Sequence, residues 1–245
     1  MITSKDNKMY KGWVKLLQKK YRQKNQMFLG EGEHLILEAK KAGVLVEILL
    51  CGGVSLEIDA PVTYLSKPLF EKLASTVTTA GMIAVCRMKE HEIKQKNRLL
   101  IVDGVSDPGN LGTLIRSALA FGFDGMVISE DTVDIYNEKV VRATQGAIFN
   151  LPIIRRNLAD YIFSLQQSGV VVYAATLDTD AKILDDLAPV EKMAFIVGSE
   201  GAGIRNELIS ISDGCVIIEM AQAVESLNVG VAGSILMYQF SKKSY

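Results

Sequence analysis

Residues 99–128 read LLIVDGVSDPGNLGTLIRSALAFGFDGMVI, and this stretch decides the fold. Residues 99–102 are apolar without alternation, which is typical of a strand buried on both faces. A Pro-Gly pair then predicts a tight turn, and residues 111–121 have apolar side chains at helical spacing. A second apolar run follows at residues 125–128. A strand, a helix and a strand in this order indicate a parallel α/β unit.

The same alternation continues to the end of the chain. The pattern predicts further helices at 137–143, 158–167, 207–211 and 227–240, and further strands at 170–175, 194–197 and 215–218. We therefore expect an α/β domain with a mostly parallel sheet at residues 98–245.

A smaller alternating unit precedes this domain. Here the pattern predicts helices at 10–25, 31–42 and 68–74, and strands at 44–50, 62–65 and 82–87. Residues 89–97 read KEHEIKQKN and have no apolar period, so they are interpreted as a linker. The expected domains are residues 1–97, including the linker, and residues 98–245.

The composition is that of an ordinary globular protein, with 245 residues, 49% apolar and 22% charged. No apolar run reaches the roughly 18–20 residues of a membrane span, and no secretion signal is visible at the N-terminus. Three scattered cysteines give neither a disulfide framework nor zinc spacing. A reducing cytoplasm is expected, with no membrane partner.

Charge is distributed unevenly along the chain. Residues 1–97 carry 16 basic and 10 acidic side chains, a net charge of +6, whereas residues 98–245 have a net charge of −7. This asymmetry predicts that the N-terminal part meets a polyanion.

The most basic segment is residues 1–28, with a net charge of +7. It also contains three aromatic residues, Tyr10, Trp13 and Tyr21. One interpretation is that these rings stack on the bases or riboses of a nucleic acid. The alternative is a solvated amphipathic helix, in which Trp13, Leu16 and Leu17 form the buried stripe.

Several common chemistries are excluded for the C-terminal part. The only histidines are His34 and His91, so residues 98–245 hold no Ser-His-Asp or Cys-His site and no histidine metal site. The chain has neither a G-x-x-x-x-G-K-[ST] loop nor a G-x-G-x-x-G after a strand. This argues against a dinucleotide-dependent enzyme.

The first of three polar clusters at strand ends is DGVSDPGNLGTLIR, residues 103–116. Asn110 lies where a helix N-cap is expected, and Arg116 lies almost two turns further along the helix. Arg116 would form a salt bridge to Asp103 or Asp107, or it would act as a phosphate clamp at the strand's carboxyl end.

The second cluster is VGSEGAGI, residues 197–204, and the third is IIEMAQAVESLNVGVA, residues 217–232. The glycines let a ligand approach the backbone, and Glu200 favours a neutral or cationic ligand. The alternative for this loop is a plain strand-to-helix turn. Ser226 and Asn228 would cap the helix that follows, and that helix is expected to be almost wholly buried.

These three clusters, in this order, resemble the signature motifs of the SpoU (TrmH-type) family of RNA ribose 2'-O-methyltransferases, in the SPOUT superfamily. RATQGAIFNLPI, residues 142–153, is also similar. FLGEGEHLILEA, residues 28–39, resembles the family's ribosomal-protein-like substrate-binding domain. One departure is Glu219, where the family usually has proline.

The resemblance implies a SPOUT α/β domain with a trefoil knot, a homodimer, and S-adenosyl-L-methionine (AdoMet) as methyl donor, without a metal. It places four residues at the donor: Thr176, Gly198, Ile218 and Leu227. It places five in the catalytic pocket: Asn110, Arg116, Glu200, Ser226 and Asn228. AdoMet is a sulfonium cation, which agrees with the carboxylate of Glu200. The role of Arg116 is phosphate positioning or, with help from an RNA phosphate, that of general base.

The expected activity is methyl transfer from AdoMet to a ribose 2'-hydroxyl, and the separate N-terminal domain favours 23S rRNA as the substrate. Three alternatives are tRNA as the substrate, an RNA-binding protein that has lost catalysis, and a dinucleotide-dependent enzyme. The intact motifs and the missing nucleotide fingerprint argue against the last two. The sequence does not identify the modified nucleotide.

Overall fold

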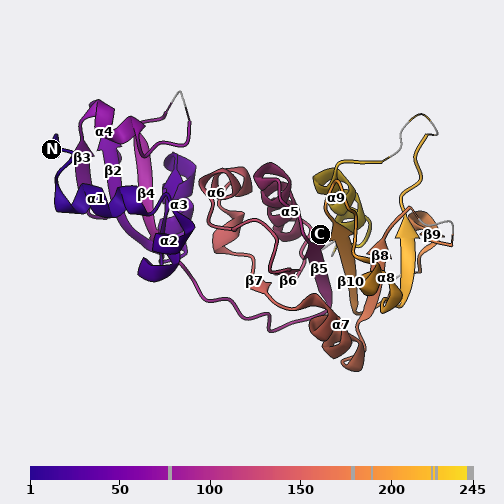
Figure 1. The fold of residues 1–245 in the computed structure, drawn as a ribbon. Coiled ribbons are helices and arrows are strands. Elements are labelled where there is room, and N and C mark those ends of the chain that lie inside the picture. The colour runs from indigo at the N-terminus through magenta and orange to yellow at the C-terminus, as the bar shows by residue number, and fades with distance from the viewer. Residues whose placement is uncertain (77–78, 178–179, 189, 222, 224–225, 242–245) are drawn as a thin grey trace. The chain divides into compact units, whose positions relative to one another are not determined.

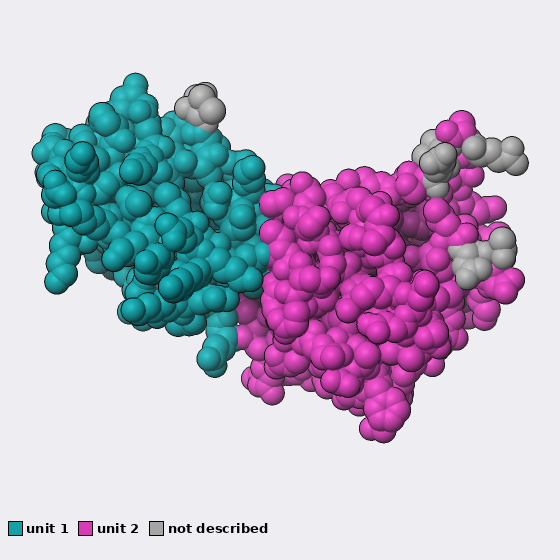
Figure 2. Space-filling model, in the orientation of Figure 1, with its two compact units in different colours: residues 1–90, 134–150 teal, residues 91–133, 151–245 magenta. Residues whose placement is uncertain are grey.

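The computed structural model describes all residues except 77–78, 178–179, 189, 222, 224–225 and 242–245. Contacts divide the chain into two units (Figure 2): unit 1 comprises residues 1–90 and 134–150, and unit 2 comprises residues 91–133 and 151–245. Residues 134–150 thus pack with the N-terminal residues, although they interrupt unit 2 in the sequence. The domain boundaries 1–97 and 98–245 remain a prediction.

Unit 1 is a small four-stranded sheet with helices. Its elements are α1 (Lys8–Lys15), α2 (Lys19–Asn25), β1 (Met27–Glu31), α3 (Glu33–Lys41), β2 (Leu45–Cys51), β3 (Val62–Leu65), α4 (Lys67–Glu71), β4 (Met82–Arg87), α6 (Glu138–Thr144) and the 3-10 helix η1 (Ala147–Phe149). The strand order is β1-β4-β2-β3, with β2 and β3 parallel and the other pairs antiparallel. Residues 27–31, where no strand was predicted, form an edge of this sheet.

The helix predicted at residues 10–25 is in fact two helices, and Arg22 explains the break. Its Nη1 donates to the carbonyl oxygens of Leu16 and Leu17 at 3.0 and 2.9 Å, which satisfies carbonyls left open where α1 ends. Its Nη2 pairs with Asp134 Oδ2 at 2.6 Å. Because this guanidinium is buried, Arg22 is a structural cation and adds nothing to a basic surface.

The aromatic rings of the basic segment are mostly buried. Tyr10 and Trp13 lie in the core of unit 1, and the Tyr10 hydroxyl donates to the Leu69 carbonyl at 3.1 Å. The prediction that these two rings stack on bases is therefore wrong. The alternative, an amphipathic helix with Trp13, Leu16 and Leu17 as its buried stripe, is confirmed for Trp13 and Leu16, whereas Leu17 is only partly buried. Tyr21 is partly exposed, with Lys15 Nζ 5.5 Å from its ring centroid.

Unit 2 is the larger α/β unit (Figure 1). Its elements are β5 (Arg98–Asp103), α5 (Pro108–Ala120), β6 (Gly125–Ile128), β7 (Ile153–Arg155), α7 (Leu158–Gln167), β8 (Val171–Ala175), β9 (Lys182–Ile183), η2 (Leu184–Asp186), β10 (Met193–Gly198), α8 (Asn206–Ser210), β11 (Gly214–Ile217) and α9 (Val229–Gln239). The strand order is β7-β6-β5-β10-β8-β11-β9, and every described pair is parallel. The expected α/β class with a parallel sheet is confirmed.

Helices cover both faces of this sheet. Ile101 of β5 and Ile196 of β10 belong to a core cluster with side chains from α7 and α8. On the other face α9 packs on β10 and on α5. This second contact is very close, because a Cβ added at Gly233 in α9 would lie 2.3 Å from Leu114 Cδ2 in α5. The central strands β5 and β10 are therefore buried on both sides, as their apolar runs predict.

The outer side of α9 is not buried. Val229 and Leu236 are in the core, but Val231 is 46% exposed and Tyr238 is 57% exposed. Leu119 of α5 is also exposed. The prediction that α9 is almost wholly buried is therefore wrong for one apolar side of the helix. Within the described residues, no helix is long and apolar enough to cross a membrane.

Candidate functional site

A cavity of about 460 Å³ lies at the carboxyl ends of β8, β10 and β11. Its size is within the usual range for small-molecule sites, and its place is where open parallel sheets bind ligands. All four predicted donor-binding residues line it: Thr176, Gly198, Ile218 and Leu227. Glu200 and Ser226, from the predicted catalytic group, line it as well.

The glycine-rich loop after β10 closes on itself. Ser199 and Gly203 exchange two backbone hydrogen bonds, of 3.1 and 2.9 Å, and Gly203 has φ of +69°. A Cβ at Gly198 would lie 2.1 Å from the Gly203 carbonyl carbon. Only glycine fits at Gly198, since backbone atoms fill the space of any side chain. The loop thereby presents its backbone to the cavity.

Hydrogen bonds between side chains join the three sequence clusters. The Asn110 amide donates from Nδ2 to Glu200 Oε1, and Asn228 Nδ2 donates to Asn110 Oδ1 at 2.9 Å. Asn110 comes from α5, Glu200 from the glycine-rich loop and Asn228 from the start of α9. Two bonds that span 90 and 118 positions of the sequence thus form one polar group beside the cavity.

The helix caps explain how the two asparagines are held. Asn228 is the N-cap of α9, and its Oδ1 accepts from the amides of Gly230 and Val231. The predicted N-cap role of Asn110 is wrong, because Asp107 caps α5. The Asp107 side chain accepts from the backbone amide of Asn110 at 2.8 Å. Pro108 suits the first helical position because its φ is already fixed there. The Asn110 side chain is therefore available to Glu200.

Arg116 is not part of this polar group. It is exposed on α5, does not line the cavity, and has no hydrogen bond or ion pair within the described part of the chain. The predicted salt bridges to Asp103 and Asp107 do not form. Asp103 pairs instead with Arg205, and Asp107 caps α5.

Glu200 is the only charged side chain among the described residues that line the cavity. A lone carboxylate in a mostly apolar site favours a neutral or cationic ligand over a phosphate. Glu219 lies between two lining residues, Ile218 and Met220, but it is exposed and does not itself line the cavity. It therefore adds no second charge to the lining. The described residues include no cluster of three or more His, Cys, Asp and Glu that could hold a metal ion.

Sequence reasoning missed the role of Asp103, which was considered only as a partner of Arg116. Its side chain is 2% exposed and accepts from Arg205 Nε at 2.9 Å and from Nη2 at 2.8 Å. The hydrogen bond to Asp103 raises the pKa of Arg205 above its ordinary value. Two signals in the sequence could have indicated this ion pair: a carboxylate directly after a buried strand, and an arginine just past the glycine-rich loop.

Comparison with known proteins agrees with this geometry. The family model of the SpoU rRNA methylases matches residues 97–238. The chain belongs to the SpoU rRNA methylase family. A second model, the MRM3-like substrate binding domain, matches residues 7–84.

Similar proteins match almost the whole chain. The 23S rRNA (guanosine(2553)-2'-O)-methyltransferase RlmP of Bacillus subtilis (strain 168) is 40% identical over 97% of this chain and 97% of its own length. The AdoMet-bound rRNA methyltransferase from Sinorhizobium meliloti has a TM-score of 0.85 at 25% identity, over 97% of this chain and 95% of that one. A solved RNA 2'-O ribose methyltransferase also has a TM-score of 0.85, at 28% identity, over 97% of this chain and 96% of that one.

The expected SpoU family, methyltransferase class and N-terminal substrate-binding domain are thus confirmed. AdoMet, the expected donor, is bound in the relative from Sinorhizobium meliloti. The roles of the individual site residues remain predictions.

Proposed function

We propose that this protein transfers a methyl group from AdoMet to a ribose 2'-hydroxyl of 23S rRNA. The observation that carries the proposal is the cavity at the glycine-rich loop, where the Asn110–Glu200–Asn228 group adjoins the predicted donor site. Family membership and the relative that shares 40% identity over 97% of the chain support it. The same relative supports the guanosine equivalent to position 2553 as the target.

The residues of the cavity fit AdoMet. Gly198, Ile218 and Leu227 would hold it largely through backbone groups, with Thr176 at the neighbouring strand end. Glu200 supplies the one negative charge among the described lining residues, which suits a cation. When bound, AdoMet supplies an electrophilic methyl group on a sulfonium centre.

The protein's own contribution is alignment and proton handling. A ribose hydroxyl is a weak nucleophile, so it needs close positioning and removal of its proton. Asn110, Ser226 and Asn228 would orient the ribose beside the cavity. Arg116, whose guanidinium is unpaired among the described residues, would bind an RNA phosphate next to the reacting nucleotide. The alternative role for Arg116 is that of a general base assisted by this phosphate.

We further propose that the protein is a homodimer whose interface covers the apolar side of α5 and α9. Leu119, Val231 and Tyr238 are exposed on these two helices. The helices are already joined, since Ser117 Oγ lies 2.8 Å from Ser234 Oγ. Val231→Asp should turn a dimer into a monomer in light scattering, and an unchanged mass would contradict this interface.

The deciding experiment maps 2'-O-methylated nucleotides in total RNA from cells with and without the protein. We expect one 23S rRNA guanosine to lose its methyl group without the protein. Loss at a tRNA nucleotide would support the tRNA alternative. No change, together with RNA binding by the purified protein, would support the non-catalytic alternative. The cytoplasmic location follows from the rRNA substrate and is part of this proposal.

A matching binding experiment tests the donor. Calorimetry in the presence of EDTA should show binding of AdoMet to the purified protein, because the cavity provides a carboxylate and backbone groups. A folded protein that binds neither AdoMet nor its demethylated product would contradict the proposed cofactor.

A further inference from the structure

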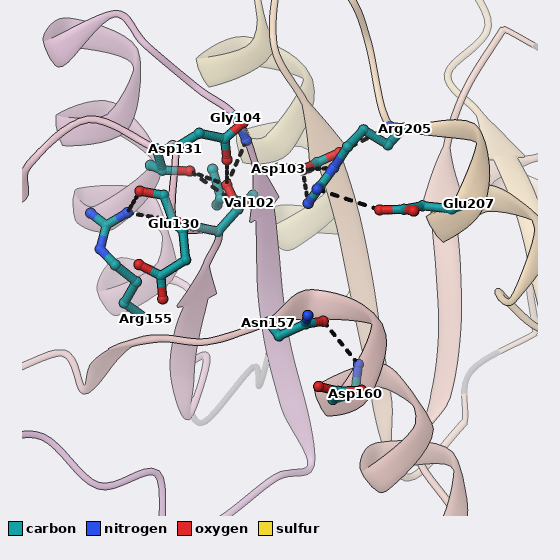
Figure 3. Close-up of polar contacts among 12 residues, drawn as sticks. Val102, Asp103, Gly104, Glu130, Asp131, Arg155, Asn157, Asp160, Arg205 and Glu207 are labelled. Atoms are coloured by element: carbon teal, nitrogen blue, oxygen red, sulfur yellow. Dashed lines mark hydrogen bonds and ion pairs between the residues drawn. The ribbon is translucent and has the colours of Figure 1, made fainter.

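Asp103 is a buried carboxylate that touches both ends of the glycine-rich loop. At the end of β5 it pairs in register with Gly198, the last residue of β10, where the loop begins. The loop returns at Arg205, whose backbone amide donates to Asp103 Oδ2 at 2.9 Å. The Arg205 guanidinium donates to Oδ1 from Nε at 2.9 Å and from Nη2 at 2.8 Å (Figure 3).

This pair is asymmetric in its burial. The Asp103 side chain is 2% exposed, whereas the Arg205 side chain is 48% exposed. A buried carboxylate is strongly unfavourable unless its charge and lone pairs are satisfied, so Asp103 requires Arg205 more than Arg205 requires Asp103. Arg205 has a second, exposed partner in Glu207, with Nη1 3.4 Å from Oε1. The arginine is therefore held at the end of the loop by Asp103.

The strand end that carries Asp103 is itself fixed. The amide of Gly104 donates to Ser129 Oγ at 2.9 Å, and Ser129 Oγ donates to Asp131 Oδ1. Arg155 Nη1 donates to the Glu130 carbonyl at 2.8 Å, which holds the same segment after β6 (Figure 3). The backbone next to Asp103 is thus fixed by its own hydrogen bonds, so Asp103 can hold the loop in place.

We propose that the Asp103–Arg205 pair is a positioning device that sets the glycine-rich loop in the shape that binds AdoMet. The loop is then fixed at its base by Asp103 and further along by the bond from Asn110 to Glu200. Neither Asp103 nor Arg205 lines the cavity, so both act through the loop. This inference rests on the proposed binding of AdoMet in this cavity.

The test measures AdoMet binding to the full-length protein by calorimetry. Asp103→Asn keeps the shape of the side chain but removes its charge and places an NH₂ group among donors. Arg205→Ala keeps the backbone bond to Asp103 and removes the guanidinium. Each variant should raise the dissociation constant for AdoMet at least tenfold. Glu207→Gln is the matched control, since it removes only the exposed partner of Arg205, and it should stay within twofold of the parent.

Further readouts separate positioning from a general loss of structure. In methylation assays KM for AdoMet should rise at least tenfold, while kcat at saturating AdoMet stays within about threefold, because no reacting atom is touched. Arg205→Lys should restore part of the affinity by returning a positive charge. The double variant Asp103→Asn/Arg205→Ala should have a dissociation constant for AdoMet no higher than that of the single variant with the lower affinity. The reason is that the two residues act as one unit.

The outcomes that contradict the inference are distinct from those that contradict the proposed function. If the parent binds AdoMet and Arg205→Ala binds it equally well, the pair does not position the loop. Additive effects in the double variant would also overturn the inference. If Asp103→Asn does not fold, Arg205→Ala and Arg205→Lys decide the question alone. A parent protein that does not bind AdoMet would overturn the proposed function and this inference together.

Discussion

At the scale of single residues, Arg116 is an exposed member of the predicted catalytic group and has no hydrogen bond to Asn110, Glu200 or Asn228. It has no hydrogen bond or ion pair among the described residues, so its replacement should not disturb folding. We expect Arg116→Ala and Arg116→Lys to reduce turnover by at least ~10²-fold, about 3 kcal/mol in transition-state stabilisation. Lysine keeps the charge but loses the planar fork that binds phosphate with two bonds.

The measurement for Arg116 combines a methylation assay, calorimetry with AdoMet and a thermal melt. AdoMet affinity and melting temperature should stay close to those of the parent. Near-parental turnover in Arg116→Lys would show that Arg116 contributes only a positive charge and that its planar guanidinium is not needed. Unfolding of Arg116→Ala would instead reveal a structural role.

Cys86 gives a prediction about pH. Burial raises the pKa of its thiol from 9.0 to about 12. As the pH rises above 9, the unfolded chain releases this proton while the folded protein keeps it, so stability falls between about pH 9 and pH 12. Between pH 8 and pH 10 the contribution is about 1 kcal/mol of unfolding free energy.

Urea unfolding of the parent and of Cys86→Ala at pH 8 and pH 10 isolates this effect. Tyr10, Tyr136 and Tyr161 also have raised pKa values through burial, but both proteins share them. The parent should lose more stability than Cys86→Ala over this interval. Equal losses would show that the thiol ionises alike in the folded and unfolded chains.

At the scale of helices and strands, the close packing of α5 and α9 depends on Gly233. A Cβ there would lie 2.3 Å from Leu114 Cδ2, and Leu114 is fully buried and has little room to turn away. We expect Gly233→Ala to lower the unfolding free energy by about 1–3 kcal/mol through overpacking. This would outweigh the gain of up to ~1 kcal/mol that alanine brings to a helix.

Gly12 of α1 offers a matched control, because a Cβ there would meet nothing within 4 Å. Gly12→Ala should stabilise its helix, by up to ~1 kcal/mol. Circular dichroism melts compare the two variants, and fluorescence of Trp13 follows unit 1 alone. A stabilised Gly233→Ala would show that α5 and α9 can move apart freely.

Elements with clear apolar runs and turn signals were predictable from the sequence, and strands of two or three residues were not. The bounds of β3, β4, β6 and α7 match the predicted ranges, since apolar runs with clear turn signals define them. The strands β7 and β9 have only three and two residues, too few for a pattern, and form because neighbouring strands offer partners.

For the candidate site, motifs located the residues but not their contacts. Thr176, Gly198, Ile218 and Leu227 all line the cavity, as expected. The bond between Asp103 and the Arg205 amide spans 102 positions, and no local pattern reveals a partner at that distance. The trefoil knot implied by the family resemblance remains a prediction.

At the scale of the whole molecule, the basic N-terminal segment predicts salt-dependent RNA binding. Lys19, Lys20 and Lys24 are exposed around α2, whereas Arg22 is buried and paired. Replacing an exposed lysine that contacts a phosphate with glutamine should lower the salt slope of log affinity by about 0.7 for single-stranded RNA. Arg22 should not be replaced, because breaking a buried ion pair costs about 3–5 kcal/mol of stability.

Filter binding of a 23S rRNA fragment over a salt series measures these slopes. Lys182→Gln is the control, since Lys182 is exposed in the acidic half of the chain. The slope should fall for Lys19→Gln, Lys20→Gln or Lys24→Gln and stay unchanged for Lys182→Gln. Affinity that does not depend on salt would contradict an electrostatic role for this segment.

The assignment of residues 134–150 to unit 1 has a consequence for synthesis on the ribosome. Phe28 packs with Tyr136 and Phe149, at 4.6 and 6.2 Å between ring centroids, so this side of the core is open until those residues emerge. The interval from residue 91 to residue 150 is about 60 residues, or about 3–12 s at ordinary elongation rates. During those seconds we expect the nascent chain to display an apolar face to which chaperones of emerging polypeptides can bind.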